Sequence, residues 1–118
     1  MEGRKNVIKE KSFEFALKII KYCDVLIGSK KYVLSRQLLK SGTSVGANIR
    51  EAQQAESKQD FIHKLKISLK EADETEYWLL LCKFSYSDSN IENLLNDILE
   101  IKKLLVSIIL KAQNNLRK

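Results

Sequence analysis

The sequence of 118 residues contains no proline, four glycines, two cysteines and one histidine. So little turn-forming material does not suit the many short strands of a β-sandwich or β-barrel, and neither fold is expected. One histidine and two cysteines are also too few for a typical zinc site or a disulfide scaffold. A di-iron bundle is not expected either, because it needs Glu-x-x-His motifs on two helices.

Long hydrophobic segments are lacking as well. The longest uninterrupted apolar stretch, tyrosine not counted, is Trp78–Cys82, far short of the roughly 20 residues that cross a bilayer. Met1–Lys11 is polar and basic and has no signal-peptide core. Cys23 and Cys82 lie in apolar surroundings, which favours buried thiols in a reducing compartment, although a disulfide stays open. We therefore expect a cytoplasmic protein that does not contact membranes.

Apolar residues make up 44% of the chain and recur at intervals of three and four, which predicts amphipathic helices in one all-α domain spanning residues 1–118. Four helices are expected, at about residues 12–27, 32–55, 58–84 and 90–116. The poor helix formers of Ser41–Gly46 interrupt the second, which either kinks or breaks there. We expect one long, kinked helix, because small residues allow close packing against a neighbour.

The expected first helix has Ser12 as its N-cap. Its apolar positions are Phe13, Ala16, Leu17, Ile20, Cys23 and Ile27. The apolar positions expected in the second helix are Val33, Leu34, Leu38, Val45, Ile49 and Ala52. One face of the third helix is expected to combine Phe61, Leu65, Ser68, Leu69, Ala72, Thr75, Glu76, Leu79 and Cys82. A loop is expected at residues 85–90, with Ser89 or Asn90 capping the last helix.

The last helix carries a heptad seam of apolar residues. The seam consists of Ile91, Leu94, Ile98, Ile101, Leu105, Ile108 and Ala112. Further apolar residues lie outside it, and a bundle covers only one side of each helix, so the surplus faces another chain or stays exposed. We predict homo-oligomerisation through Leu104, Val106, Ile109 and Leu110. Residues of the third helix that would assist are Ile62, Ile67, Trp78 and Leu81.

The formal charge of +6 favours acidic partners such as nucleic acid. The first 31 residues hold most of the basic excess, and their basic side chains are the candidate phosphate contacts, although lysines on helices are often merely solvated. These are Arg4, Lys5, Lys9, Lys11, Lys18, Lys21, Lys30 and Lys31. A base-stacking platform is not predicted, because the aromatic residues are not interleaved with a basic run. They are Tyr22, Tyr32, Tyr77, Trp78 and Tyr86.

No catalytic, cofactor or metal motif is evident. His63 has no evident positioning partner, and the acidic residues from Glu71 to Glu76 are interpreted as members of surface ion pairs. Residues Gly42–Gly46 lack the ending of a P-loop and any preceding strand. We therefore expect a non-enzymatic protein without a small-molecule substrate, with an unrecognised site around His63, Glu71 and Glu74 as the remaining alternative.

Two segments carry a family resemblance. Arg36–Ala52 (RQLLKSGTSVGANIREA) and Ser68–Thr75 (SLKEADET) resemble the signature of a bacterial four-helix-bundle family first found encoded in intervening sequences of 23S rRNA genes. With the helix layout, the resemblance covers Phe13–Leu116. Two positions depart from the family pattern, since Ala52 stands where glycine is frequent and Arg50 replaces a small residue.

The resemblance implies a left-handed, up-down antiparallel four-helix bundle that assembles into a ring, commonly a pentamer. It also implies kinship with the accessory variability protein of diversity-generating retroelements, whose pentamer binds a reverse transcriptase and nucleic acid. No catalytic residue is carried over. Within the motifs, structural roles are expected for Gln37, Asn48, Glu51, Ser68 and Glu71. The first three are interpreted as buried or half-buried polar residues paired across helices, since an unpaired one would cost about 1–3 kcal/mol.

The function expected from these observations is a non-enzymatic, ring-forming bundle that binds RNA or a nucleoprotein through its basic surface. The alternative is a protein-interaction scaffold, for example for a reverse transcriptase, that does not contact nucleic acid directly. A protein partner that survives nuclease treatment would favour the scaffold.

Overall fold

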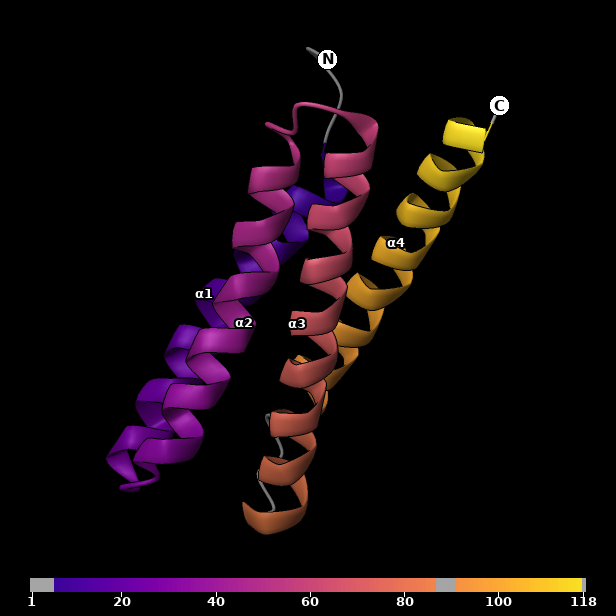
Figure 1. Ribbon diagram of the computed structural model, residues 1–118. Helices are drawn as coiled ribbons and strands as arrows, with labels where there is room; N and C mark the ends of the chain where they lie inside the picture. Colours follow the sequence, from indigo (N-terminus) through magenta and orange to yellow (C-terminus); the bar gives the residue numbers. More distant parts are fainter. Residues whose placement is uncertain (1–5, 87–90, 118) are drawn as a thin grey trace.

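The computed structural model describes residues 6–86 and 91–117, which fold into four long helices (Figure 1). They are α1 (Val7–Gly28), α2 (Tyr32–Ala52), α3 (Lys58–Tyr86) and α4 (Ile91–Arg117). Successive helices run in opposite directions, and no strand occurs in the described residues. The expected all-α, up-down four-helix bundle is therefore confirmed. Ser85 and Tyr86, expected in a loop at residues 85–90, are instead the last residues of α3. The rest of that loop and the cap expected at Ser89 or Asn90 lie outside the described residues.

The helices follow one another around the bundle. α2 packs between α1 and α3, and α3 packs between α2 and α4, whereas the interface between α1 and α4 is the smallest. Figure 1 shows the C-terminal half of α4 leaving the other helices, and the molecule is 51 Å long. α1 and α2 thus form one side of the bundle, and α3 and α4 form the other.

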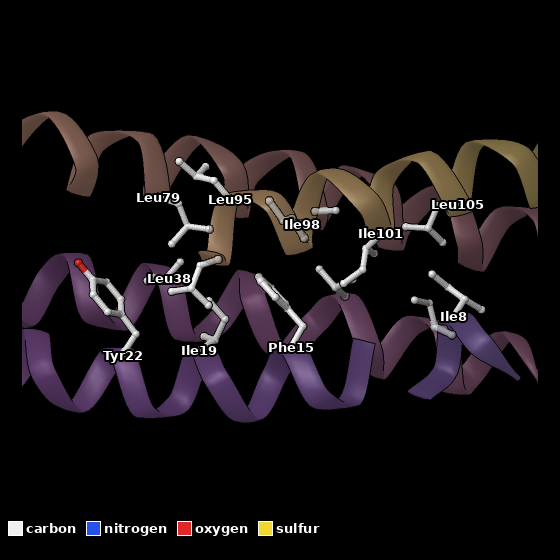
Figure 2. Packing of buried hydrophobic residues seen from close by; sticks show 14 of the residues in the cluster. Ile8, Phe15, Ile19, Tyr22, Leu38, Leu79, Leu95, Ile98, Ile101 and Leu105 are labelled. Carbon is white, nitrogen blue, oxygen red and sulfur yellow. The ribbon is translucent and has the colours of Figure 1, made fainter. Parts of the chain in front are cut away.

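The core runs along the bundle axis and takes residues from all four helices (Figure 2). The predicted seam of α4 is confirmed, because its first five members are buried and Ile108 and Ala112 pack against the core. The predicted face of α3 is also confirmed, with Leu65, Leu79 and Cys82 buried. Both cysteines are buried thiols.

α1 begins earlier than predicted. Asn6 caps it, because the Asn6 side-chain oxygen accepts a hydrogen bond from the backbone N–H of Lys9 at 3.2 Å. Ser12, the predicted N-cap, is instead buried in the second turn, where its hydroxyl donates to the carbonyl oxygen of Lys9 at 3.1 Å. Asparagine is as good a cap as serine, and Val7 and Ile8 extend the apolar pattern, so the helix starts at the earlier cap.

The apolar face predicted for α1 is largely wrong. Phe13 is 61% exposed, and Leu17, Ile20 and Ile27 are exposed as well. The buried stripe is a different one, built from Ile8, Ser12, Phe15, Ile19, Tyr22, Cys23 and Leu26. α1 carries two apolar stripes, and periodicity alone does not say which one faces the core.

The glycines of α2 decide which stripe of α1 is buried. A Cβ atom at Gly42 would lie 2.9 Å from Cγ2 of Ile19, and one at Gly46 would lie 3.3 Å from the carbonyl oxygen of Ser12. α1 therefore approaches α2 closely along these two glycines.

α2 itself is one continuous helix through Ser41–Gly46, so it does not break in two. Leu38, Val45, Ile49 and Ala52 are buried as predicted, but Val33 is exposed. The helix ends at Ala52, three residues before the predicted end, and a turn at Gln53 and Gln54 follows.

Candidate nucleic-acid interface

The largest uncompensated positive charge lies around α2. Residues 25–50 contain no aspartate or glutamate but five basic residues. They are Lys30, Lys31, Arg36, Lys40 and Arg50. Counting charge over broad segments of the sequence hides this stretch, because the acids before residue 25 and after residue 50 fall into the same segments. The missed signal is an acid-free run, which a running count of acidic residues would have found.

Three of these side chains form a stripe on α2. Arg36, Lys40 and Arg50 lie within about 80° of one another around the helix, and all three are exposed. The stripe spans roughly 21 Å, the rise over fourteen helical residues. None of the three forms an ion pair with a residue that the structure describes. Their charge is therefore available to a partner.

The turn between α1 and α2 adds the other two cations at one end of the stripe. Lys30 is exposed and adopts a left-handed backbone conformation with φ 63°. Such a residue reverses the chain tightly, and the backbone N–H of Lys31 closes the turn on the carbonyl oxygen of Leu26 at 2.8 Å. The Lys31 ammonium lies 4.3 Å from the centroid of the Tyr86 ring.

The basic residues predicted on α1 do not gather on one face. Lys11 pairs with Glu100 at 2.5 Å and Lys18 with Asp97 at 2.8 Å, so both tie α1 to α4. The hydrogen bond and charge of Glu100 raise the pKa of Lys11. Lys9 and Lys21 are exposed but point about 120° apart around the helix. Arg4 and Lys5 lie outside the described residues.

The polar motif residues hold α2 and α3 together in part. The Ser68 hydroxyl donates to the carbonyl oxygen of Val45 at 2.8 Å in the buried interface. Asn48 is half-buried, but its amide donates to Ser44 of its own helix at 2.9 Å, so the predicted pairing across helices is wrong for it. Gln37 is half-buried.

The expected burial of Glu51 is also wrong, because its side chain is exposed. It forms an ion pair with Lys64 of α3 at 3.0 Å, which links the two helices at the surface. Its position next to the end of α2 leaves it in solvent, where an ion pair contributes little to stability.

The alternative catalytic site, expected around His63, Glu71 and Glu74, does not form, because these residues are spread along α3. Glu71 lies two helical turns from His63, roughly 12 Å along α3, and Glu74 lies farther still. Lys102 of α4 instead pairs with Asp73 at 2.8 Å and with Glu76 at 2.6 Å. Among residues 6–86 and 91–117, no group of three potential metal ligands occurs. The acidic residues of α3 thus serve largely to attach α4.

Glu71 is half-buried, and burial together with the charge of Glu74 raises its pKa. When folding raises the pKa of a carboxyl, the folded protein loses stability as the pH rises from the pKa of the unfolded state to that of the folded state. We expect Glu71→Gln to raise the free energy of unfolding modestly at pH 7. Urea unfolding at pH 7 and below pH 4 tests this, because the gain should vanish where the carboxyl is protonated in both states.

Among the described residues, apolar side chains remain uncovered on an α4 face and in a groove between α1 and α2. The α4 face consists of Leu99, Val106 and Leu110, which are all exposed. Of the interface predicted from the sequence, Val106 and Leu110 belong to this face, whereas Leu104 is half-buried and Ile109 is buried in the protomer's own core. Ile109 therefore has no surface to offer to another copy, because it is only 6% exposed.

The second surface is the α1–α2 groove, a depression of about 550 Å³. Its apolar floor comes from the uncovered stripe of α1 and the small residues of α2, with polar side chains at the rim. The lining residues are Asn6, Lys9, Glu10, Ser12, Phe13, Ala16, Thr43, Gly46, Ala47 and Arg50. Assisting residues predicted on α3 are less available, since Ile62 is buried and Ile67 and Trp78 are half-buried, although Leu81 is exposed.

Within the described residues, none of the four helices has an apolar stretch long enough to span a membrane. No curated protein matches the chain. A solved structure from Bacteroides thetaiotaomicron, a protein of unknown function from the S23 ribosomal protein family, is 52% identical and superposes with a TM-score of 0.83. The match covers 86% of this chain and 97% of that one.

The model of the 23S rRNA-intervening sequence protein family matches residues 4–107, which include both motifs, the basic stripe and most of α4. This chain therefore belongs to the family of 23S rRNA-intervening sequence proteins.

Proposed function

We propose that this protein is a non-enzymatic, cytoplasmic homo-oligomer that binds RNA through the α2 stripe and the α1–α2 turn. The observation that carries the proposal is the acid-free run of residues 25–50, whose five basic residues include three exposed, unpaired cations on one face of α2. Phosphate contacts by such cations release counterions, which supplies most of the affinity of non-specific RNA binding.

Oligomerisation would strengthen this electrostatic attraction. A pentamer, the assembly implied by the resemblance, would carry about +30, five times the +6 of one chain. The two uncovered apolar surfaces support an assembly of identical chains. They differ from each other, so the α4 face of one copy can pack into the α1–α2 groove of the next. Such packing would cover Arg50 at the rim of the groove and leave Arg36 and Lys40 of the stripe open to RNA. Such a head-to-tail interface closes into a ring when the rotation between copies permits it.

The salt dependence of binding to a structured fragment of rRNA tests the RNA proposal. We expect the affinity to fall steeply between 50 and 200 mM salt. Arg36→Gln with Lys40→Gln should weaken binding and lower the slope of log K against log salt by about 2 for each engaged protomer, since each phosphate contact contributes about 1. Fluorescence anisotropy at several salt concentrations measures both quantities.

A matched control is Lys58→Gln with Lys66→Gln, which removes two exposed charges from α3, outside the stripe. The slope of this variant should stay within about 0.5 of the unmodified protein. Equal effects of the two double variants would contradict the placement of the interface on α2. Absence of binding at 50 mM salt would contradict RNA binding altogether.

The scaffold alternative draws on the α1–α2 groove, whose apolar floor also suits a protein partner such as a reverse transcriptase. Affinity capture with and without nuclease separates the two functions. A partner protein retained after nuclease treatment, together with absence of direct RNA binding, would favour the scaffold.

A further inference from the structure

Beyond the stripe, the fold assembles aromatic and basic side chains at one end of the bundle. The end pocket, an open depression of about 400 Å³, lies between the start of α2 and the end of α3. In Figure 1 these two segments lie at the lower end of the molecule. The lining residues are Lys30, Lys31, Tyr32, Val33, Leu34, Gln37, Trp78 and Tyr86. Three aromatic rings and two cations that are up to 56 positions apart in the sequence thus share one site.

The rings of the end pocket differ in how accessible they are. Tyr32 is 53% exposed, whereas Trp78 is half-buried and forms one wall. Tyr86 is 38% exposed and lies beneath the Lys31 ammonium, so a cation covers one face of its ring. Tyr32 therefore offers the open aromatic surface, and Lys30 and Lys31 supply the positive charge beside it.

This combination matches the chemistry of a single nucleotide. A nucleobase stacks on an aromatic ring, and the phosphate that follows it is attracted by adjacent ammonium groups. The volume of about 400 Å³ lies within the range of small-ligand pockets. A carboxylate is also nearby, because Trp78 donates weakly to Glu74 at 3.4 Å, but the two lysines outweigh this single negative charge.

We propose that the end pocket binds an unpaired nucleotide of RNA, with its base stacked on Tyr32 beside Trp78 and its phosphate held by Lys30 and Lys31. This inference rests on the proposed RNA-binding function and adds which form of RNA is recognised. Bases inside a duplex are stacked on each other and have no face to offer, so the pocket selects single-stranded segments. Arg36 follows Tyr32 by one helical turn, so the strand would continue from the pocket onto the α2 stripe.

Trp78 is the only tryptophan of the chain, and its fluorescence therefore reports directly on the pocket. We expect an unstructured 12-nucleotide RNA to quench this fluorescence with the same midpoint that anisotropy of the labelled RNA gives. A 12-base-pair duplex of the same sequence should bind with little quenching. The full chain is used in both titrations.

Variants of Tyr32 separate stacking from charge. Tyr32→Ala should weaken binding of the single strand by about tenfold, without a change in the salt slope or in duplex affinity. Tyr32→Phe keeps the ring and should stay within about twofold of the unmodified protein. Phe84→Ala is the control, because Phe84 is an exposed aromatic residue, at 79%, that does not line the pocket.

The outcomes distinguish this inference from the function on which it rests. Salt-dependent RNA binding without quenching, and with no effect of Tyr32→Ala, would overturn the pocket and leave the α2 stripe in place. Absence of any RNA binding would overturn both. Quenching by the single strand that Tyr32→Ala removes and Tyr32→Phe preserves would establish the stacking site.

Discussion

Val106→Glu combined with Leu110→Glu is expected to convert the assembled protein into single copies of 13.6 kDa. Both side chains are exposed on the α4 face, so the substitutions leave the core of the protomer intact. At an interface between copies, each carboxylate would lose its water, which costs several kcal/mol without a partner. Sedimentation velocity at micromolar concentration, with far-ultraviolet circular dichroism as a check on folding, measures the result.

The same variant is expected to bind structured RNA at least tenfold more weakly at low salt, because one protomer offers far fewer phosphate contacts than a ring. Phe84→Glu is the control for charge and folding, since Phe84 is an exposed apolar residue at 79% that belongs to neither apolar surface. Phe84→Glu should sediment as an assembly of the same mass as that of the unmodified protein. A single-copy unmodified protein would contradict the proposed assembly.

A mixing experiment tests whether the interface is head-to-tail. Phe13→Glu places a carboxylate in the α1–α2 groove and should also yield single copies, because Phe13 lines the groove and is exposed. Mixed with the α4-face variant, it should form a heterodimer, since one intact groove then meets one intact α4 face. Contact between two α4 faces would not produce this heterodimer, and its absence would contradict the head-to-tail arrangement.

The largest expected effect on stability comes from Gly42→Val, which should lower the free energy of unfolding by about 3 kcal/mol. The Cβ atom of the new side chain would lie 2.9 Å from Cγ2 of the fully buried Ile19, a β-branched residue with little freedom to move. Helix propensity does not compensate, because valine is only slightly better than glycine. Urea unfolding followed by circular dichroism measures the loss.

Gly28→Val is the matched control. Nothing lies within 4 Å of a Cβ atom at Gly28, the last residue of α1, so this substitution should change stability by no more than about 0.5 kcal/mol. A double variant with Ile19→Ala should lose less stability than the sum of the single variants, because the alanine makes room for the valine. Equal losses for Gly42→Val and Gly28→Val would contradict the close approach of α1 and α2.

Periodicity sufficed for the parts of the fold where one helix face is clearly apolar. The seam of α4 and the apolar face of α3 were predicted correctly, and residues such as Leu65, Ile98 and Leu105 are buried where the spacing placed them. The small residues around Gly42 also indicated close packing correctly. Hydrophobic spacing failed in α1, because its two stripes are equally apolar in sequence and only the fit of Ile19 against Gly42 selects one.

For the basic and aromatic residues of the candidate RNA site, too, the sequence alone indicated some features and packing decided the others. Lys30 and Lys31, predicted from the sequence as phosphate contacts, lie in the proposed site, and their charge does not depend on packing. Lys11 and Lys18 looked equivalent to them in sequence, yet the path of α4 brings Glu100 and Asp97 within ion-pair distance. The order of the aromatic residues along the chain did not predict a base-stacking site, because Tyr32 belongs to α2 whereas Trp78 and Tyr86 belong to α3.

The amino-acid sequence by itself determined the helical class, the four segments and the excess of positive charge, because these depend on spacing and composition within short stretches. Tertiary structure alone decided which stripe of α1 is buried, which lysines are paired and which rings meet beside Lys30 and Lys31. The physical reason is that burial and charge pairing depend on side chains from distant parts of the chain, and only the packing of α1, α2, α3 and α4 brings those side chains together.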